Sequence, residues 1–433
     1  MGDDSTQLRF AAAPGDIMVD SMDPLMETVL GSRLTFVERL DPRTLARASL
    51  LLVDLEPVLG CWLDKRPRSA DWVRCEGLDE RAVFSMAISE DPDRDSSEFH
   101  GNPFDPTGPR FAVLLLRSHD RDDLCVRFDH AAGDGWSARE VTHLLADVYS
   151  RLLDDPGYVP PPRTAPRPDH SDVWAALTEE QRRAAANPLS ITNASRWTMK
   201  AQPGSGDRLA VRTLTLSAER VVALREYAHA RGGTVNDALV SALVRAVESH
   251  NPQRPGLKPG VSISADTRRF AKEPGLERLP IIATTQTVMI EFRHGESFDE
   301  TLKHVIEAVK PYKDSLWSVG SIANETLPSP RTWRAIFWFA ATALRLTRAA
   351  AMVTMNVGPF DDRRLAFGSA HPEAAIVTGP IERFAGFPLL ISYYRGALTL
   401  WTGFRERYIA PDLVERRLAA IDDQLAKAVG GLH

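Results

Sequence analysis

Apolar residues recur at helical spacing in two well-separated parts of the chain. Between residues 42 and 55, leucine and alanine return every three or four positions, which predicts an amphipathic helix. Asp41 and Pro42 suit the N-terminus of this helix, and Pro57 ends it. Residues 234–250 repeat the pattern and start with the residues of a capping box. Both halves of the chain are therefore predicted to contain helices.

Alternating and β-branched residues predict strands between these helices. The clearest are residues 210–216, 260–266 and 282–290. Ser217 follows the first of these strands and opens a further helix, which runs to the Gly-Gly pair at 232–233. Because strands and helices are mixed in both halves, the sequence predicts an α/β (α+β) fold.

A proline-rich segment divides the chain. Residues 154–169, DDPGYVPPPRTAPRPD, contain clustered prolines, which remove amide donors and favour extended backbone. With 433 residues, the chain exceeds the usual domain size of about 150 residues. We therefore predict an N-terminal lobe over residues 1–153, an interlobe linker over residues 154–205 and a C-terminal lobe over residues 206–433.

Composition narrows the classes of function. The formal net charge is −6, and Lys and Arg are spread throughout the chain, so we expect no nucleic-acid partner. The three cysteines, Cys61, Cys75 and Cys125, show no metal-ligand spacing, and we expect neither a metal nor a bound cofactor. Residues 1–16 lack the basic and apolar regions of a secretory signal. We expect a cytoplasmic protein that is a monomer.

The most apolar stretch runs from Trp333 to Val353. Arg334, Arg345 and Arg348 interrupt it, so its uncharged core is too short to span a bilayer. The stretch predicts a buried helix or one that lines an apolar channel. Peripheral contact with lipid is the alternative, because arginines flank the apolar residues.

Residues 124–152 carry the strongest local pattern, in which a strand, a loop with glycines and a helix follow in immediate succession. Within the strand, Phe128 has the same parity as His130, whereas Asp129 has the opposite parity. If the strand persists, His130 and Asp129 face opposite ways. Only one of these two side chains is then directed into a given cleft.

The loop and the helix start place His130 in a setting that suits acid–base chemistry. Gly133 and Gly135 permit a tight turn or close approach to a ligand, and Ser137 with Glu140 predicts a capping box that opens the helix. The imidazole would lie beside loop amides and the positive end of the helix dipole, where negative charge can develop. A purely structural histidine is the alternative.

The segment DHAAGDGWS, residues 129–137, closely resembles the HHxxxDG signature of nonribosomal-peptide condensation domains, polyketide-associated acyltransferases, wax-ester synthases and plant BAHD acyltransferases. Other segments resemble the family in the same order: NPFDPTGPRFAVLLLR upstream, then GGTVNDALVSALVRAV, ISADTRR and MNVGPF downstream. Together these segments cover nearly the whole chain. The resemblance implies two lobes like those of chloramphenicol acetyltransferase, each a mixed sheet with flanking helices, and an active-site tunnel between them.

The resemblance also implies the chemistry. His130, at the second histidine of the signature, would deprotonate a hydroxyl or amine acceptor as it attacks a thioester carbonyl. The thioester would be acyl-CoA or a phosphopantetheinyl carrier protein, used as a co-substrate in natural-product or lipid biosynthesis. The resemblance implies no bound cofactor.

Further residues take roles from the same resemblance. Asp134 would be structural and pair with Arg268 of the second lobe, with Arg269 as the near alternative. Gly135 would direct its amide towards the developing oxyanion, unless it serves only as a turn residue. Three more residues are possible substrate contacts, each with a structural alternative: Asn356 as a turn former, Trp136 as a packing residue and Ser137 as a helix cap.

The main departure from the family is Asp129, which stands where the first histidine is usual. Because the parity turns Asp129 away from the face of His130, we expect activity to survive this change. The strand at 282–290 also lacks dipeptides common in peptide-bond-forming condensation domains, so a stand-alone O- or N-acyltransferase fits better. The alternatives are a non-catalytic condensation-like module that recruits a carrier protein or partner enzyme, and a related epimerase, dehydratase or cyclase.

Overall fold

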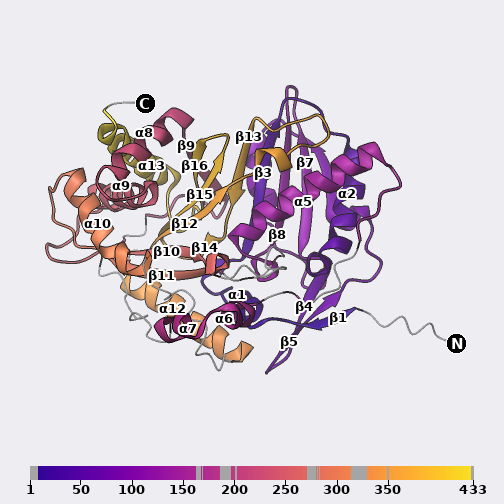
Figure 1. The fold of residues 1–433 in the computed structure, drawn as a ribbon, viewed down its shortest axis with the longest axis horizontal. Helices are drawn as coiled ribbons and strands as arrows, with labels where there is room; N and C mark the ends of the chain where they lie inside the picture. Colours follow the sequence, from indigo (N-terminus) through magenta and orange to yellow (C-terminus); the bar gives the residue numbers. More distant parts are fainter. Residues whose placement is uncertain are drawn as a thin grey trace.

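Two mixed sheets, each covered by helices, make up most of the molecule (Figure 1). The computed structural model describes residues 8–161, 167, 169–185, 197–199, 202–270, 279, 281, 283–313, 329–348 and 351–430. The predicted α/β class, with mixed sheets and flanking helices, is confirmed.

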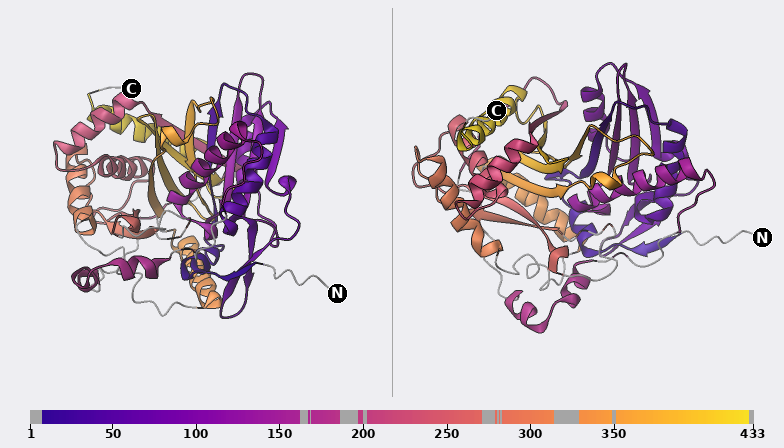
Figure 2. Two further views of the ribbon diagram at one scale, coloured as in Figure 1. Left: turned by 45° about the vertical axis from the view of Figure 1, so that its right-hand side comes forward. Right: turned by 45° about the horizontal axis from the view of Figure 1, so that its top comes forward.

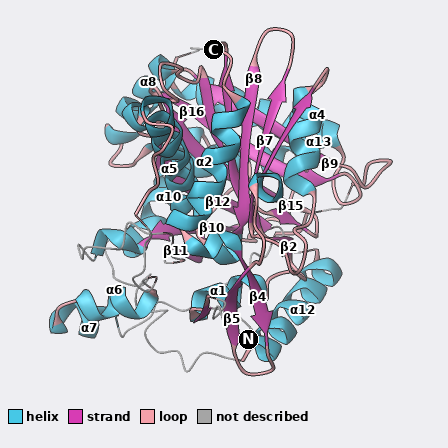
Figure 3. Cartoon of the chain, turned by 90° about the vertical axis from the view of Figure 1, so that its right-hand side faces the viewer, coloured by secondary structure: helices cyan, strands magenta, loops and turns pink. Residues whose placement is uncertain are grey.

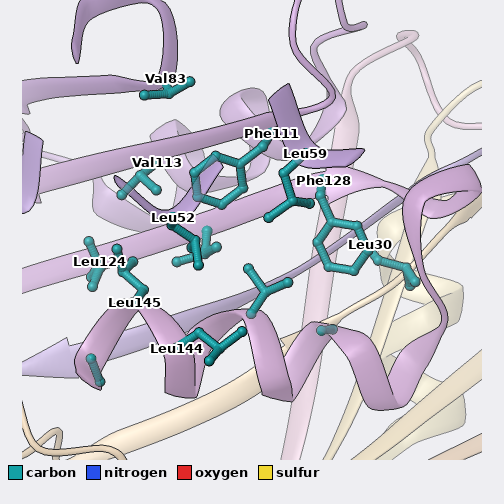
Figure 4. Close-up of a cluster of buried hydrophobic side chains, with 14 of the residues drawn as sticks. Leu30, Leu52, Leu59, Val83, Phe111, Val113, Leu124, Phe128, Leu144 and Leu145 are labelled. Carbon is teal, nitrogen blue, oxygen red and sulfur yellow. The ribbon is translucent and has the colours of Figure 1, made fainter. Parts of the chain in front are cut away.

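The first sheet has five strands in the order β13-β3-β8-β7-β6. Its strands are β3 (Val29–Phe36), β6 (Phe84–Ile88), β7 (Phe111–Arg117), β8 (Asp122–Asp129) and β13 (Ala374–Thr378). Helices α2 (Pro42–Leu55) and α5 (Gly135–Asp154) pack together beside this sheet. Leucine, valine and phenylalanine side chains fill the space between sheet and helices, as Figure 4 shows for Phe111, Phe128 and Leu145.

The second sheet has eight strands, in the order β11-β10-β12-β15-β16-β14-β2 with β9 paired to β16. The strands are β2 (Met26–Glu27), β9 (Leu209–Leu216), β10 (Gly260–Asp266), β11 (Ala283–Met289), β12 (Ala351–Pro359), β14 (Ile381–Glu382), β15 (Gly386–Tyr394) and β16 (Ala397–Arg405). Four helices accompany this sheet: α8 (Ala218–His229), α9 (Val235–His250), α10 (Phe298–Lys313) and α13 (Pro411–Ala428). They enclose a second apolar core with the sheet.

Smaller elements complete the fold. A three-stranded sheet is formed by β1 (Arg9–Ala11), β5 (Ala70–Arg74) and β4 (Cys61–Lys65). The remaining α-helices are α1 (Pro14–Asp20), α3 (Glu80–Val83), α4 (Pro92–Gly101), α6 (His170–Ala176), α7 (Glu179–Ala185) and α12 (Pro330–Thr347). Short 3₁₀ turns include η2 (His130–Ala132), η3 (Thr267–Phe270) and η4 (Asp362–Arg364). Helix α12 contacts α1 at the end of the molecule that also holds β4 and β5 (Figure 3).

The capping residues predicted for three helices are confirmed. Asp41 caps α2, Ser217 caps α8, and Thr234 forms a capping box with Asp237 at the start of α9. Each of these side chains accepts a hydrogen bond from a backbone amide that lacks a partner within its helix. The local sequence therefore determines where these helices begin.

The two main sheets exchange strands across the predicted lobe boundary. Strand β13 lies in the predicted C-terminal lobe but pairs with β3 in the first sheet, while β2 from the N-terminal lobe pairs with β14 in the second. Figure 2 shows the two groups of strands side by side. These two strand pairings connect the N-terminal and C-terminal parts of the chain through backbone hydrogen bonds. The boundaries at residues 153 and 205 remain predictions.

Candidate active site

A cavity of about 1230 Å³ lies between the two main sheets and has walls from both halves of the chain. The first half contributes His130, Asp134 and Trp136, and the second contributes Arg268 and Asn356. Five of the predicted site residues therefore line one cavity. Gly135 is a further member of its wall.

His130 stands where strand β8 ends. Its backbone amide donates to the carbonyl of Thr28 over 2.8 Å, and its ring Nδ1 lies 2.9 Å from the carbonyl oxygen of Gly133. A carbonyl oxygen only accepts hydrogen bonds, so Nδ1 carries the proton in the neutral ring. The other nitrogen, Nε2, then keeps its lone pair. The half-buried imidazole thus provides a potential base at the cavity wall.

Asp134 joins the loop of His130 to the second half of the chain. Its carboxylate accepts hydrogen bonds from Arg268 Nη1 at 3.0 Å and Arg268 Nη2 at 3.2 Å, and from the backbone amide of Ala283 at 3.1 Å. The pairing with Arg268 that the resemblance implied is present. Asp134 is 1% exposed, so this ion pair is shielded from water and holds α5 against η3 and β11. The side chain of Arg269, the alternative partner, lies outside the described residues.

Arg268 also packs against the ring of Trp136. The guanidinium carbon lies 4.4 Å from the centre of the Trp136 ring, a cation–π contact, and Nη1 donates to Asp266 over 3.1 Å. Trp136 is half-buried and lines the cavity. Its ring therefore lies against the Arg268 guanidinium at the cavity wall.

The predicted capping arrangement of Ser137 is wrong. Asp134, not Ser137, is the N-cap of α5, and Ser137 is the third helical residue that completes the capping box. Ser137 is fully buried and is not among the described residues that line the cavity. Its hydroxyl donates a hydrogen bond to the Asp134 carboxylate over 3.1 Å. Glu140, predicted as the partner of Ser137, instead pairs with Arg364 at 2.7 Å.

Gly135 is the first residue of α5, and its closeness to the second sheet explains the absence of a side chain. A β-carbon at this position would lie 2.6 Å from a methyl carbon of Val357 on β12. Glycine therefore permits β12 to approach the helix start. The amides of the first helical turn have no carbonyl partners within the helix, and the dipole there favours negative charge.

Asp129 lines a different pocket from His130, so the two side chains lie apart as predicted. Its carboxylate accepts a hydrogen bond from the Ala131 amide at 2.9 Å and lies 3.6 Å from Arg110. Burial raises the pKa of Asp129, and the charge of Arg110 opposes that rise. Asp129 and Arg110 line a separate pocket of about 700 Å³. The departure from the family signature therefore lies outside the cavity of His130.

The second half brings Asn356 and α12 to the cavity. Asn356 lies within strand β12 beside a bulge, where its side-chain oxygen accepts from the Gly358 amide at 3.0 Å. Helix α12 lines the cavity with Trp333, Phe337 and Leu344. The apolar stretch predicted from Trp333 to Val353 is not helical throughout, because α12 ends at Thr347 and β12 begins at Ala351. The opposite face of α12 is exposed. Among the described residues, no helix combines the length and apolarity needed to cross a membrane.

Arg139 and Glu382 are charged residues of the cavity wall that were not predicted from the sequence. Arg139 lies one helical turn after Gly135, on the same face of α5, and donates to the carbonyl of Pro359. The position of Arg139, four residues after Gly135 of the signature, could have indicated that it faces the cavity. Glu382 follows β13 by four residues, and no local pattern marks it. No group of three or more His, Cys, Asp or Glu within the described ranges is arranged to hold a metal ion.

Comparison with solved structures identifies proteins that have a similar fold. No protein-family model and no curated protein matches the sequence. The structure is similar to the trichothecene 15-O-acetyltransferase TRI3 from Fusarium sporotrichioides, with a TM-score of 0.68 and 12% identity over 99% of this chain and 97% of that one. It is also similar to the first condensation domain of the CDA synthetase, with a TM-score of 0.63 and 17% identity over 100% and 98% of the two chains.

A third similar structure is polyketide synthase associated protein 5 from Mycobacterium tuberculosis, with a TM-score of 0.62 and 12% identity over 98% of each chain. These alignments extend over both sheets of the present chain. The protein therefore has the two-lobed fold of condensation domains and chloramphenicol-acetyltransferase-like acyltransferases. At these sequence identities the similarity establishes the fold alone, and the reaction has to be inferred from the residues of the site.

Proposed function

We propose that the protein is an acyltransferase that moves an acyl group from a thioester to a hydroxyl or amine acceptor. The observation that carries this proposal is the tautomer of His130 at the wall of the interlobe cavity. With the Nδ1 proton directed to the Gly133 carbonyl, Nε2 is free to accept a proton. The Asp134–Arg268 ion pair supports the proposal because it fixes the loop that bears the histidine.

In this mechanism, Nε2 of His130 removes the proton from the acceptor as its oxygen or nitrogen forms a bond to the thioester carbonyl carbon. The carbonyl oxygen becomes an oxyanion, and the amide of Gly135 at the positive end of α5 is the group proposed to stabilise it. Collapse of this intermediate breaks the carbon–sulfur bond. The imidazolium then returns its proton to the leaving thiolate, which restores the neutral histidine.

The donor is proposed to be acyl-CoA or an acylated phosphopantetheinyl carrier protein, and no bound cofactor or metal takes part in these steps. The condensation domains among the similar structures favour a carrier protein, and the acetyltransferase TRI3 favours a hydroxyl acceptor. A cytoplasmic monomer without a nucleic-acid partner remains our prediction. The test is release of free thiol from a panel of acyl-CoA and acyl-carrier-protein donors, measured with and without alcohol and amine acceptors. Acceptor-dependent release supports transfer, and its absence for every donor contradicts it.

A non-catalytic module that recruits a carrier protein is the second candidate. Asp129 in place of the first histidine of the signature is the observation that favours it. A carrier protein that binds without any thiol release would identify this function. The buried contacts of Asp129 with Ala131 and Arg110 favour the enzyme instead, because they leave the His130 side of the strand undisturbed.

Peripheral contact with lipid is proposed for the outer face of α12. Ile336, Trp338, Phe339 and Leu346 are exposed on this helix, and arginines flank them at both ends. We expect the protein to sediment with anionic phosphatidylserine vesicles more than with neutral phosphatidylcholine vesicles. Replacing Trp338 and Phe339 together with serine should reduce the bound fraction several-fold. Equal sedimentation of this variant and the wild type would contradict the proposal.

A further inference from the structure

Glu382 is a buried carboxyl group in the wall of the same cavity, and none of the steps above uses it. It ends the two-residue strand β14, which pairs with β2 on one side and β16 on the other. The residue is 8% exposed, and its side chain lines the cavity that contains His130. Burying a carboxyl group is costly unless a partner compensates it, so its contacts decide its role.

No partner within the described residues compensates Glu382. Its Oε2 atom is buried and has no hydrogen-bond partner there. The charged neighbours are paired elsewhere: Glu27 on β2 with Arg405 on β16 at 2.8 Å, and Arg383 with Asp23 at 3.2 Å. Burial without an opposing charge raises the pKa of Glu382 to about 8. The carboxyl group is therefore mostly neutral at pH 7.

Apolar and aromatic residues line part of the cavity that contains Glu382. They include Met26, Pro388, Phe384 and Phe337, and Phe384 also belongs to a small buried cluster with Leu25 and Ala341. Aromatic faces attract cations, and the effect increases where water is excluded. A ligand group that combines an apolar body with one positive charge fits these surroundings, because the carboxyl group and the rings both favour it.

Glu382 and His130 are attached to the same short segment of chain. The Glu382 backbone pairs with Met26, and the His130 amide donates to the carbonyl of Thr28. Two residues of extended backbone span about 7 Å, so the attachment points lie within the length of a small molecule. A single acceptor molecule can therefore contact both the Glu382 and the His130 side chain.

We propose that Glu382 binds a basic nitrogen of the acceptor, so that the acceptor is an apolar molecule carrying an ammonium group in addition to the hydroxyl or amine that is acylated. The role of this molecule as acceptor rests on the proposed function, whereas its binding does not. On binding, the neutral carboxyl group releases its proton to solvent, and the carboxylate pairs with the ammonium group. The charge in the cavity is then balanced.

The experiment compares octylammonium chloride with 1-octanol by isothermal titration calorimetry at pH 7, in two buffers of different ionisation enthalpy. The wild type should bind octylammonium at least about tenfold more tightly than octanol and release close to one proton per molecule bound. Glu382→Gln should lose the preference for octylammonium and the proton release while retaining octanol binding. The exposed Glu38 provides the control, and Glu38→Gln should behave as the wild type.

Equal binding of octylammonium to the wild type and Glu382→Gln, or wild-type binding without proton release, overturns the inference. If Glu382→Gln does not fold, Glu382→Met replaces the carboxyl group by an apolar side chain of similar length. Because the carboxyl group has no partner to lose, this variant should unfold at a higher temperature than the wild type, and a lower temperature overturns the inference. Acyl transfer without ammonium preference contradicts this inference alone, and ammonium binding without transfer to any acceptor contradicts only the proposed function.

Discussion

His130→Ala is expected to lower the rate of acyl transfer by about 10²- to 10⁴-fold, the contribution usual for a general base. The substitution removes Nε2, the nitrogen that accepts the proton of the acceptor, and leaves the thioester carbonyl without an activated nucleophile. Stability should change little, because the imidazole makes one described side-chain hydrogen bond, to the Gly133 carbonyl, and is only half-buried. The rates are measured at saturating donor and acceptor, so that weaker binding is not mistaken for slower chemistry.

The matched control for this prediction is His119→Ala. His119 is exposed in the turn between β7 and β8, remote from the cavity lining. The control should transfer at the wild-type rate, and both variants should unfold at the wild-type denaturant concentration. A His130→Ala protein that is folded and retains the full rate would show that His130 is not the base.

Asp134→Ala is expected to destabilise the fold by about 3 kcal/mol, because it leaves the Arg268 guanidinium in a buried position with a weaker set of partners. The variant also loses the N-cap of α5, which contributes about 1 kcal/mol within that loss, and the acceptor of the Ala283 amide. Chemical unfolding followed by tryptophan fluorescence measures the change. Acyl transfer should fall as well, since the loop of His130 is no longer held against η3.

Asp266→Ala is the matched control for Asp134→Ala. Asp266 also bonds to Arg268, but its side chain is 44% exposed, so its removal should cost less than about 1 kcal/mol. In a double-mutant cycle, replacing Arg268 with methionine should remove most of the difference between the Asp134 and Asp266 variants. Equal destabilisation by the two aspartate substitutions would contradict an interlobe role for Asp134.

Local patterns in the sequence predicted the elements well because caps and apolar faces act over a few residues. The start of α2 at Pro42 and the capping box at Thr234 depend on side chains next to the amides that they bind. Asp129 and His130 line different pockets, as predicted, although β8 ends at Asp129 and His130 begins the turn η2, so the pleat of the strand does not extend to His130. The fold class and the position of His130 at a strand end could therefore be predicted without the structure.

Contacts between distant residues could not be predicted in this way. The helix start at Gly135 was misassigned because Ser137 with Glu140 resembles a capping box, whereas Glu140 is used by Arg364, more than two hundred residues away. The pairing of Asp134 with Arg268 came only from the family resemblance. Glu382 was missed because its position depends on contacts between distant residues: the pairing of β14 with β2 places it beside Met26, more than three hundred residues away.

Acyl transfer by His130 is tested by mass-spectrometric detection of acylated product from purified protein, supplied with acyl-CoA or acyl-carrier-protein donors and a panel of alcohols and amines. We predict that the wild type forms an ester or amide in an amount equal to the thiol released, and that His130→Ala forms almost none. Product formed equally by both proteins would contradict the role of His130. Carrier-protein binding without product from any donor would show that the protein is a recruiting module and not an acyltransferase.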